Sequence, residues 1–161
     1  MKKALWLAAW IAAALAALVL IGAQMGLFSG KPPGNLGVKE GKLAPPKPTP
    51  NNVSSQADRA NDAGHYIEPI KFSGSPAKAW AALKAAVSRM ERVKIINEAP
   101  NYLYAEFSTR LMGYTDDVEF YLDEKAGVIH VRSASRLGRS DFGVNRERIE
   151  SVRRRFAAAL A

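Results

Sequence analysis

The first 28 residues contain an uncharged apolar run that is too long for the core of a small domain. Within residues 4–28 no side chain is charged, and Gln24 is the only strongly polar one. As a helix, this run would extend about 37 Å at a rise of about 1.5 Å per residue, enough to cross a hydrocarbon layer about 30 Å thick. A domain of roughly 100 residues cannot cover a helix that is apolar on every side. We therefore predict a transmembrane anchor over residues 1–28.

A cleaved signal peptide is the alternative interpretation of this run. Lys2 and Lys3 suit the basic start of a signal peptide, but its apolar region is usually only about 7–15 residues long. Cleavage after Ala23 would also place Ile21 at the position three residues before the cut, where a small residue is expected. We therefore predict an uncleaved signal-anchor in a single-pass membrane protein. A short N-terminus before a first apolar segment favours a domain outside the cytoplasm.

The next segment has the composition of a tether between the anchor and a folded domain. A chain rich in proline, glycine and lysine favours extended, partly polyproline geometry and buries little surface. We therefore predict a tether over residues 29–50 and a domain over residues 51–161. The prolines and glycines behind this prediction are Pro32, Pro33, Pro45, Pro46, Pro48, Pro50, Gly30, Gly34, Gly37 and Gly41.

The formal net charge of +8 is concentrated near the anchor. Residues 1–60 carry seven basic and two acidic side chains, so +5 of the total lies there. Lysines beside an anchor attract anionic headgroups, and no nucleic-acid-binding motif accompanies them, so we expect no nucleic-acid partner. The chain has no cysteine, which excludes disulfides, thiolate zinc sites and a cysteine nucleophile. We expect no metal site and no cofactor.

After Asn61 the hydrophobic pattern changes between helix and strand periods. Ser75 is a predicted N-cap followed by a proline at the first helical position, and this helix should end near Arg92. Asn145 is the predicted N-cap of a second amphipathic helix. Strand-like alternation, with Pro69 suggesting a sheet edge, occurs in five runs: residues 65–72, 93–97, 102–109, 117–123 and 128–135.

The element order β-α-β-β-β-β-α predicts an α+β domain with a mostly antiparallel sheet. Each strand has one apolar face, so both helices should cover the same face of the sheet. The opposite face would be polar, and cross-strand charge pairing is its ordinary explanation. A hydrolase acting at this face is an alternative, although the sequence has no phosphate loop or nucleophile elbow and offers no catalytic residue. The candidate residues on the polar face are Glu106, Asp117, Glu119 and His130.

The densest polar stretch, residues 132–148, contains five arginines and leads into the second helix. Guanidinium groups bind carboxylates and phosphates through paired hydrogen bonds, and a helix N-terminus favours an anion. An anion between Arg132, Arg139 and Arg146 is therefore one interpretation. In the other, the arginines pair with acids such as Glu119 and Glu147. The predicted anion-binding residues are Arg132, Ser133, Arg136, Arg139 and Arg146.

Four segments of the chain resemble a known family. They are GKLAPPKPTPNNVSSQA (residues 41–57), residues 65–69, TDDVEFYLD and VIHVRSASRLGRSDFGVNRERIE. Together they resemble the domain of unknown function 1499 family over residues 41–161. The resemblance implies a membrane-associated protein without an established activity, and it places residues 53–56 in the domain. The family usually has cysteines at places matching Pro46 and Asn52, so no disulfide or metal role of that pair carries over to this chain.

These features together favour a membrane-anchored, non-enzymatic binding domain with an arginine-lined surface for anions. The expected partners are the membrane and an anionic ligand or lipid headgroup, and a protein partner is also open. One alternative is a carrier of a lipid or another small apolar ligand, and the other is the hydrolase. A deep apolar pocket would favour the carrier, and His130 beside carboxylates would favour the hydrolase.

The first prediction concerns the anchor. Because the apolar run is longer than a signal peptide and lacks a good cleavage site, the mature protein should keep its N-terminus and sediment with membranes. Mass spectrometry of the mature chain measures this directly. A mature N-terminus at Gln24 would contradict the prediction.

Overall fold

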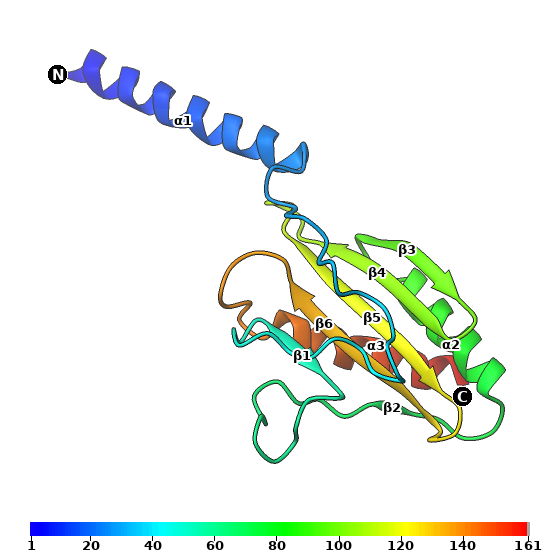
Figure 1. The fold of residues 1–161 in the computed structure, drawn as a ribbon. Coiled ribbons are helices and arrows are strands. Elements are labelled where there is room, and N and C mark those ends of the chain that lie inside the picture. Colours follow the sequence, from blue (N-terminus) through cyan, green and yellow to red (C-terminus); the bar gives the residue numbers. More distant parts are fainter. Residues whose placement is uncertain (161) are drawn as a thin grey trace.

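The computed structural model describes residues 1–160, and it confirms the predicted α+β class (Figure 1). A long N-terminal helix precedes a domain with one sheet and two helices. In chain order the elements are α1 (Lys2–Gln24), β1 (Asn52–Ser54), β2 (Ile70–Lys71), α2 (Pro76–Ser88), β3 (Val93–Ala99), β4 (Tyr102–Ser108), β5 (Thr115–Asp123), β6 (Val128–Ser135) and α3 (Val144–Leu160).

The N-terminal helix α1 is long and apolar enough to cross a membrane. It extends away from the domain (Figure 1), and its side chains are exposed except that of Ala23 in the last turn, which is buried. Alanine and leucine dominate its sequence, and both favour helices. An exposed helix that is apolar on all sides is stable in a hydrocarbon environment and costly in water.

The sheet is antiparallel throughout, with the strand order β1-β6-β5-β4-β3. The strands β3 to β6 follow one another as a meander, because short turns connect antiparallel neighbours. Two short strands share the outer edge of β6: β1 pairs with its C-terminal half and β2 with its N-terminal end. The sequence predicted one strand before α2, and the structure has two, of which β2 covers only the end of the predicted run 65–72. Pro69 lacks the N–H that a longer β2 ladder would need.

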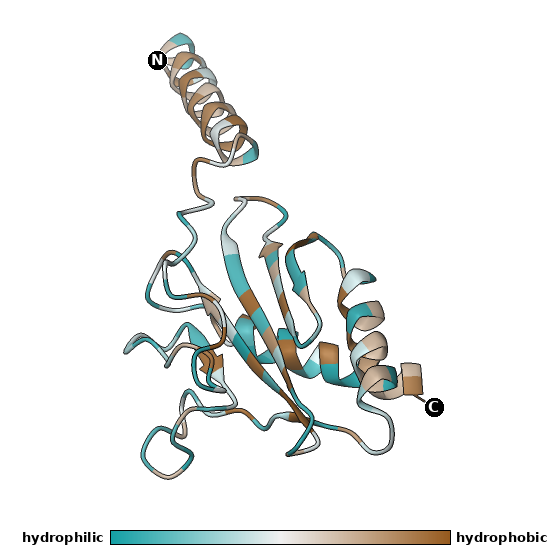
Figure 2. Cartoon of the chain, turned by 45° about the vertical axis from the view of Figure 1, so that its right-hand side comes forward, coloured by the Kyte–Doolittle hydropathy of each residue, from teal (hydrophilic) through white to brown (hydrophobic). Residues whose placement is uncertain are grey.

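Both domain helices cover one face of the sheet, as predicted. Figure 1 shows α2 and α3 behind the strands, and Figure 2 shows brown and teal residues alternating along them. Alternation places every second residue on the helix side. The fully buried side chains there include Leu83 of α2, Leu103, Val118 and Phe120 of the sheet, and Ile149 of α3.

The start of α3 differs from the prediction by a few residues. The helix begins at Val144, so Asn145 lies inside its first turn and is not its N-cap. The carboxylate of Asp141 accepts the N–H of Asn145 at 2.8 Å and that of Gly143 at 3.1 Å. Aspartate and asparagine side chains can both accept hydrogen bonds from the free N–H groups at a helix start, and in this structure Asp141 has that role. Asn145 is instead completely buried, with its side chain turned toward the sheet.

Part of the segment predicted as a tether lies across the polar face of the sheet. We call residues 30–47 the strap, and Figure 1 shows it in front of β5. Leu43 is 5% exposed, and it packs with Leu36 and Val38 against tyrosines of β4 and β5. This burial differs from the expected extended tether. The three apolar side chains are too few and too widely spaced in proline-rich sequence to be recognised as a folded element.

A tight turn reverses the strap halfway along its length. Lys39 and Lys42 exchange both backbone hydrogen bonds at 2.9 Å. The two residues between them, Glu40 and Gly41, have φ values of 52° and 74°. Positive φ at both central positions is the requirement of a two-residue type I′ turn, which glycine meets without strain. The turn brings Leu43 back onto the sheet.

The second prediction tests whether the strap belongs to the folded domain. Leu43→Ala should lower the free energy of unfolding by about 2–5 kcal/mol, because it removes a buried side chain and leaves a cavity. Ile96→Ala is the control: Ile96 of β3 is 42% exposed, so its loss should change stability by no more than about 1 kcal/mol. Denaturant unfolding of the membrane-embedded protein can be followed through Trp80, the only tryptophan outside α1. Equal stabilities of the two variants would mean that the strap is a free linker.

Candidate functional site

The polar face of the sheet carries a cluster of charged side chains beneath the strap. We call it the outer cluster. It is drawn from β4, β5, β6 and the strap, because alternation turns one set of residues on each strand to this side. It contains three acidic and three basic side chains, together with two tyrosines: Glu106, Asp117, Glu119, Lys47, Arg132, Arg136, Tyr102 and Tyr104.

At the centre of the outer cluster lies the ion pair between Glu119 and Arg132. The two residues are cross-strand neighbours on β5 and β6, and their side chains are 0% and 2% exposed. Arg132 donates from Nη1 to Glu119 Oε2 at 2.7 Å. The other carboxylate oxygen accepts the Tyr102 hydroxyl and the backbone N–H of Gly37 in the strap, both at 2.8 Å. A buried carboxylate needs such a full set of donors.

Arg136 joins the second half of the outer cluster. Its Nε and Nη2 atoms donate to Asp117 at 3.0 and 2.8 Å, and Nη2 also pairs with Glu106. The Tyr104 hydroxyl donates to Asp117 at 2.6 Å and accepts from Arg136 at 3.0 Å. Burial, and after it the Asp117 carboxylate, raises the pKa of Tyr104, so the hydroxyl stays protonated as a donor. Arg136 also reaches the carbonyl of Gly30 at 3.4 Å.

Lys47 of the strap is the third cation of the outer cluster. Its Nζ donates to the Ser135 carbonyl at 2.5 Å. Burial lowers the pKa of Lys47, and the nearby Arg132 lowers it further. Three acids and three bases leave the cluster with no net charge. The outer cluster therefore stabilises the packing of the strap and has no unbalanced charge to attract a ligand. Among residues 1–160, Arg132 Nε is one of two buried side-chain polar atoms without a partner.

The predicted anion-binding residue Ser133 lies on the opposite face, under α3. Its hydroxyl donates to Asn145 at 2.5 Å. Arg148 of α3 donates to Ser133 at 3.1 Å and to Asp116 at 2.5 Å, and it stacks 5.0 Å from the centroid of the Phe107 ring. The side chains of Asp116 and Ser133 point to the helix side because they alternate with the outer-cluster residues. These contacts anchor the first turn of α3 to the sheet.

The two remaining predicted arginines lie elsewhere. Arg139 is exposed in the loop between β6 and α3. Arg146 lies on α3, on the helix side, and donates to the carbonyls of Gly64 and Tyr66 at 2.9 and 2.8 Å. The structure thus brings Arg132 and Arg136 into one cluster with the acids predicted on the polar face, while Ser133 and Arg146 are on the other side of the sheet.

His130 of the polar face contacts a serine rather than the carboxylates. The Ser55 hydroxyl lies 3.1 Å from His130 Nδ1 and accepts the Val131 N–H at 2.9 Å. The ring stacks on Tyr121 with centroids 6.1 Å apart, and burial lowers the pKa of His130. No pattern in the sequence predicted this serine–histidine pair, because its members are 75 positions apart. Within residues 1–160 no carboxylate hydrogen-bonds to His130, and no group of acids and histidines is placed to hold a metal ion.

An open groove lies between α3 and residues 59–73, on the helix side of the domain. It has a volume of about 1170 Å³. Its floor is apolar and includes the buried Ile67, Ile70 and Phe156, while Leu160 at its C-terminal end is 45% exposed. The sequence could not predict this groove, because the two segments that form its walls are about 80 residues apart along the chain and neither contains a recognisable motif.

The rim of the groove is positively charged. Four basic and two acidic side chains line it, a net charge of +2. Arg146 and Arg153 fasten residues 64–69 to α3 through backbone carbonyls, the latter donating to Pro69 at 2.8 Å. Arg59 pairs with Glu68 at 3.0 Å and lies 5.4 Å from the Tyr66 ring centroid. Of these arginines, Arg146 has no carboxylate partner among residues 1–160.

A match to a family model confirms the family resemblance. Residues 42–156 match the model of a family described as a protein of unknown function, DUF1499. The chain belongs to this family. No curated protein and no solved structure matches the chain. In this DUF1499 chain, Asn52 occupies one of the two places where the resemblance implies a cysteine. Its side chain closes the preceding turn by donating to the carbonyls of Lys47 and Thr49 at 3.1 and 2.5 Å.

The third prediction concerns the central ion pair of the outer cluster. Glu119→Gln keeps the shape but leaves the buried Arg132 without a countercharge, so the free energy of unfolding should fall by about 3–5 kcal/mol. Replacing both partners, as Glu119→Gln with Arg132→Met, should cost less than the single change.

The exposed pair between Arg154 and Glu147 supplies the matched control, since its side chains are 64% and 70% exposed. Glu147→Gln should change stability by less than about 1 kcal/mol. Denaturant unfolding, again followed through Trp80, measures all three variants. A Glu119→Gln protein as stable as the Glu147→Gln protein would contradict the assigned role of the buried pair.

Proposed function

We propose that this protein is a membrane-anchored binding protein whose groove between α3 and residues 59–73 holds an amphiphile with an anionic headgroup. The observation behind the proposal is the groove itself, which combines an apolar floor with a cationic rim. The proposal unites two expectations from the sequence, an anion-recognising surface and a carrier of an apolar ligand. It moves the anion site from the loop after β6 to the other flank of α3.

The apolar floor supports a ligand with a hydrocarbon part. Ligand sites are mostly apolar concavities with a few polar groups that fix orientation, and they measure about 300–1000 Å³. The groove, at about 1170 Å³, is of this order and is open along one side. Leu160 and Ala157 are exposed on its wall, so an acyl chain lying there would remove apolar surface from water.

The cationic rim supports an acidic headgroup. Arg146 uses only its Nη2 atom for the two loop carbonyls, and a guanidinium group has five N–H donors. Its remaining donors and its unbalanced charge suit a phosphate or carboxylate. Arg59 is 74% exposed at the rim and can turn toward a ligand. Arginines of the outer cluster lack this capacity, because acids already balance them.

The anchor supports a ligand from the bilayer. If α1 spans the membrane, as its length and composition suggest, the domain stays beside a reservoir of anionic amphiphiles, outside the cytoplasm in the orientation expected above. We propose binding without catalysis, because the proposed site contains no nucleophile paired with a base. A hydrolytic role for Ser55 and His130 has no support, since the serine hydroxyl is buried and accepts a backbone N–H.

The fourth prediction tests the groove in the full chain embedded in nanodiscs. Dihexanoyl phosphatidic acid should shift backbone amide signals of residues 63–73 and 146–160 in NMR spectra. Glycerol 3-phosphate should bind the same region more weakly, because it lacks the acyl chains. Dihexanoyl phosphatidylcholine, whose headgroup has no net charge, should also bind more weakly. Equal shifts with the choline lipid, or shifts confined to other residues, would contradict the proposal.

Two variants locate the ligand within the groove. Ala157→Trp should abolish the shifts, because the indole fills an exposed position on the groove wall. Arg59→Gln should weaken binding about three- to tenfold by removing one rim charge. Arg155→Gln, an exposed arginine of α3 outside the groove, is the matched control and should leave affinity unchanged. Unchanged binding by Ala157→Trp would place the ligand elsewhere.

A further inference from the structure

Two loops form the end of the domain from which α1 departs. We call residues 109–114, between β4 and β5, and residues 136–143, between β6 and α3, the membrane-end loops. The first loop directly contacts the anchor: a Cβ atom on Gly113 would lie only 2.8 Å from the carbonyl oxygen of Ala23. Figure 1 shows the loop between β4 and β5 beside the C-terminal end of α1.

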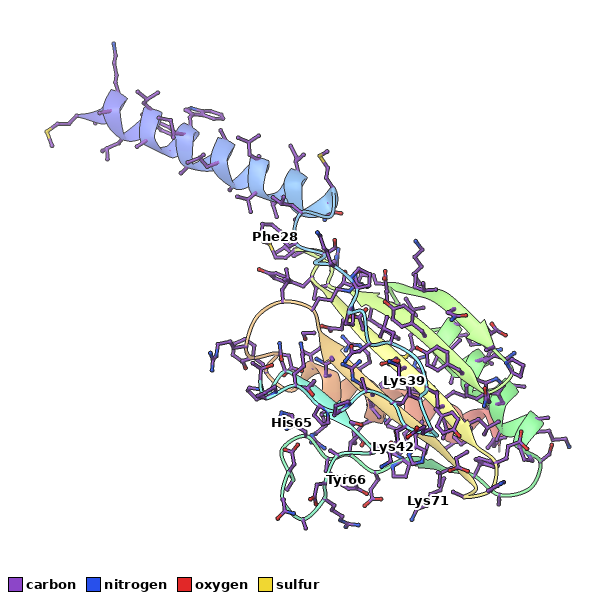
Figure 3. All side chains as sticks on the ribbon, in the orientation of Figure 1. Phe28, Lys39, Lys42, His65, Tyr66 and Lys71 are labelled. Carbon is purple, nitrogen blue, oxygen red and sulfur yellow. The ribbon has the colours of Figure 1, made fainter. Side chains whose placement is uncertain are left out.

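The residues that follow α1 also pack on these loops. The rings of Phe28 and Tyr114 lie 5.8 Å apart, and Figure 3 places Phe28 where the anchor meets the domain. Gly30 is packed against the side chains of Arg136 and Leu137, which a Cβ atom at Gly30 would meet at 3.0 and 3.2 Å. The anchor is therefore not joined by a free linker, and its end has a defined place beside both loops.

The membrane-end loops expose large apolar side chains. Leu111 is 63% exposed, Leu137 44% and Phe142 98%. Phe142 also has a φ of 54°, a conformation that bulky residues rarely adopt. In water the exposed Phe142 ring has no stabilisation from burial, and its positive φ costs conformational free energy that nothing offsets. The loop conformation holds the ring away from the protein, which is favourable where another apolar medium receives it.

Arginines flank these apolar side chains. Arg110 precedes Leu111, and Arg139 lies three residues before Phe142; both arginines are exposed. The one acid of the two loops, Asp141, is occupied by the first turn of α3. Apolar side chains beside uncompensated cations are typical of segments that lie in the interfacial region of an anionic bilayer.

The position of the anchor identifies what covers the loops. If α1 spans the hydrocarbon layer, the bilayer surface lies near the end of the helix, at Ala23 to Phe28. Gly113 and Tyr114 contact these same residues, so the first membrane-end loop lies at the level of the lipid headgroups. The second loop adjoins it through Arg136, whose N–H donates to the Thr115 carbonyl at 3.1 Å.

We propose that the membrane-end loops dock on the bilayer surface, with Leu111 and Phe142 inserted among the lipids and Arg110 and Arg139 at lipid phosphates. The domain is then held against the membrane in one orientation. This inference rests on the anchor of the proposed function and is independent of the groove. The turn between β5 and β6, which contains Lys125, lies at the opposite end of the sheet and points away from the bilayer.

Single cysteines test this arrangement cleanly, because the chain contains none. An environment-sensitive fluorophore is attached to Leu111→Cys and Phe142→Cys in the full chain, reconstituted in vesicles that contain anionic phospholipid. Leu15→Cys in α1 reports on the anchor, and Lys125→Cys is the water-exposed control. Quenching by lipids with a nitroxide near the headgroup is compared with quenching by iodide in the water.

We expect the labels at residues 111 and 142 to be quenched by the shallow nitroxide and protected from iodide. The label at residue 15 should be protected from iodide at greater depth, and the label at residue 125 should be open to iodide. Iodide access at 111 and 142, with residue 15 protected, would overturn docking and leave the anchor standing. Protection at 111 and 142 from both quenchers would also overturn it, because a second copy of the chain would then cover the loops. Iodide access at residue 15 would overturn the anchor and, with it, the docking.

Charge provides the second arm of the test. Arg139→Gln should raise iodide quenching at residue 142 by about two- to fivefold in vesicles with anionic lipid, since each basic side chain near such a surface contributes appreciably to binding. The effect should vanish in purely zwitterionic vesicles. Arg155→Gln, on the exposed face of α3, is the control and should change nothing. Equal effects of the two variants would exclude the role of Arg139.

Discussion

A carboxylate with no exposed surface, that of Glu119, ties residues 30–47 of this chain to the sheet. A buried charge is tolerated only when its countercharge and hydrogen bonds are complete. Arg132 supplies the countercharge, and Tyr102 and the backbone of Gly37 supply the other donors. Because one of these donors belongs to the strap, residues 30–47 must return to the sheet. The polar face is thereby closed to solvent without becoming apolar.

Much of this fold follows from sequence periodicity, and the part that does not has a clear physical origin. Alternation along β4, β5 and β6 correctly predicted the sheet and the face on which α2 and α3 lie. The same alternation, with Glu119 and Arg132 on the other face, looks like an ordinary solvent-facing surface. Whether such a face is wet or covered depends on a distant segment, here the strap, whose sparse apolar residues resemble a linker. The strap was therefore missed, and so was the pairing of Ser55 with His130.

The arginines of residues 132–148 show why local density is a poor guide to a site. Five arginines within seventeen residues suggested one anion site, but strand alternation and the start of α3 send them in different directions. Acids balance Arg132, Arg136 and Arg148, so these three hold the fold together. Arg146 instead meets backbone carbonyls, which accept hydrogen bonds but carry no net charge. The anion site that we propose in the groove rests on this difference, because a guanidinium group without a carboxylate partner keeps more of its attraction for an external anion.

The strap also links the buried cluster mechanically to the anchor. Gly30 contacts Arg136 and Leu137 at the membrane end, and Gly37, seven positions further along the chain, donates to Glu119. A force on α1 therefore reaches the centre of the sheet through a short, packed segment rather than through a slack tether. Rotation of the domain about the anchor would have to break the contacts of Gly30 first and then expose Glu119. Since an unpaired buried charge is costly, the outer cluster resists that rotation and helps to hold the domain at a set angle to α1.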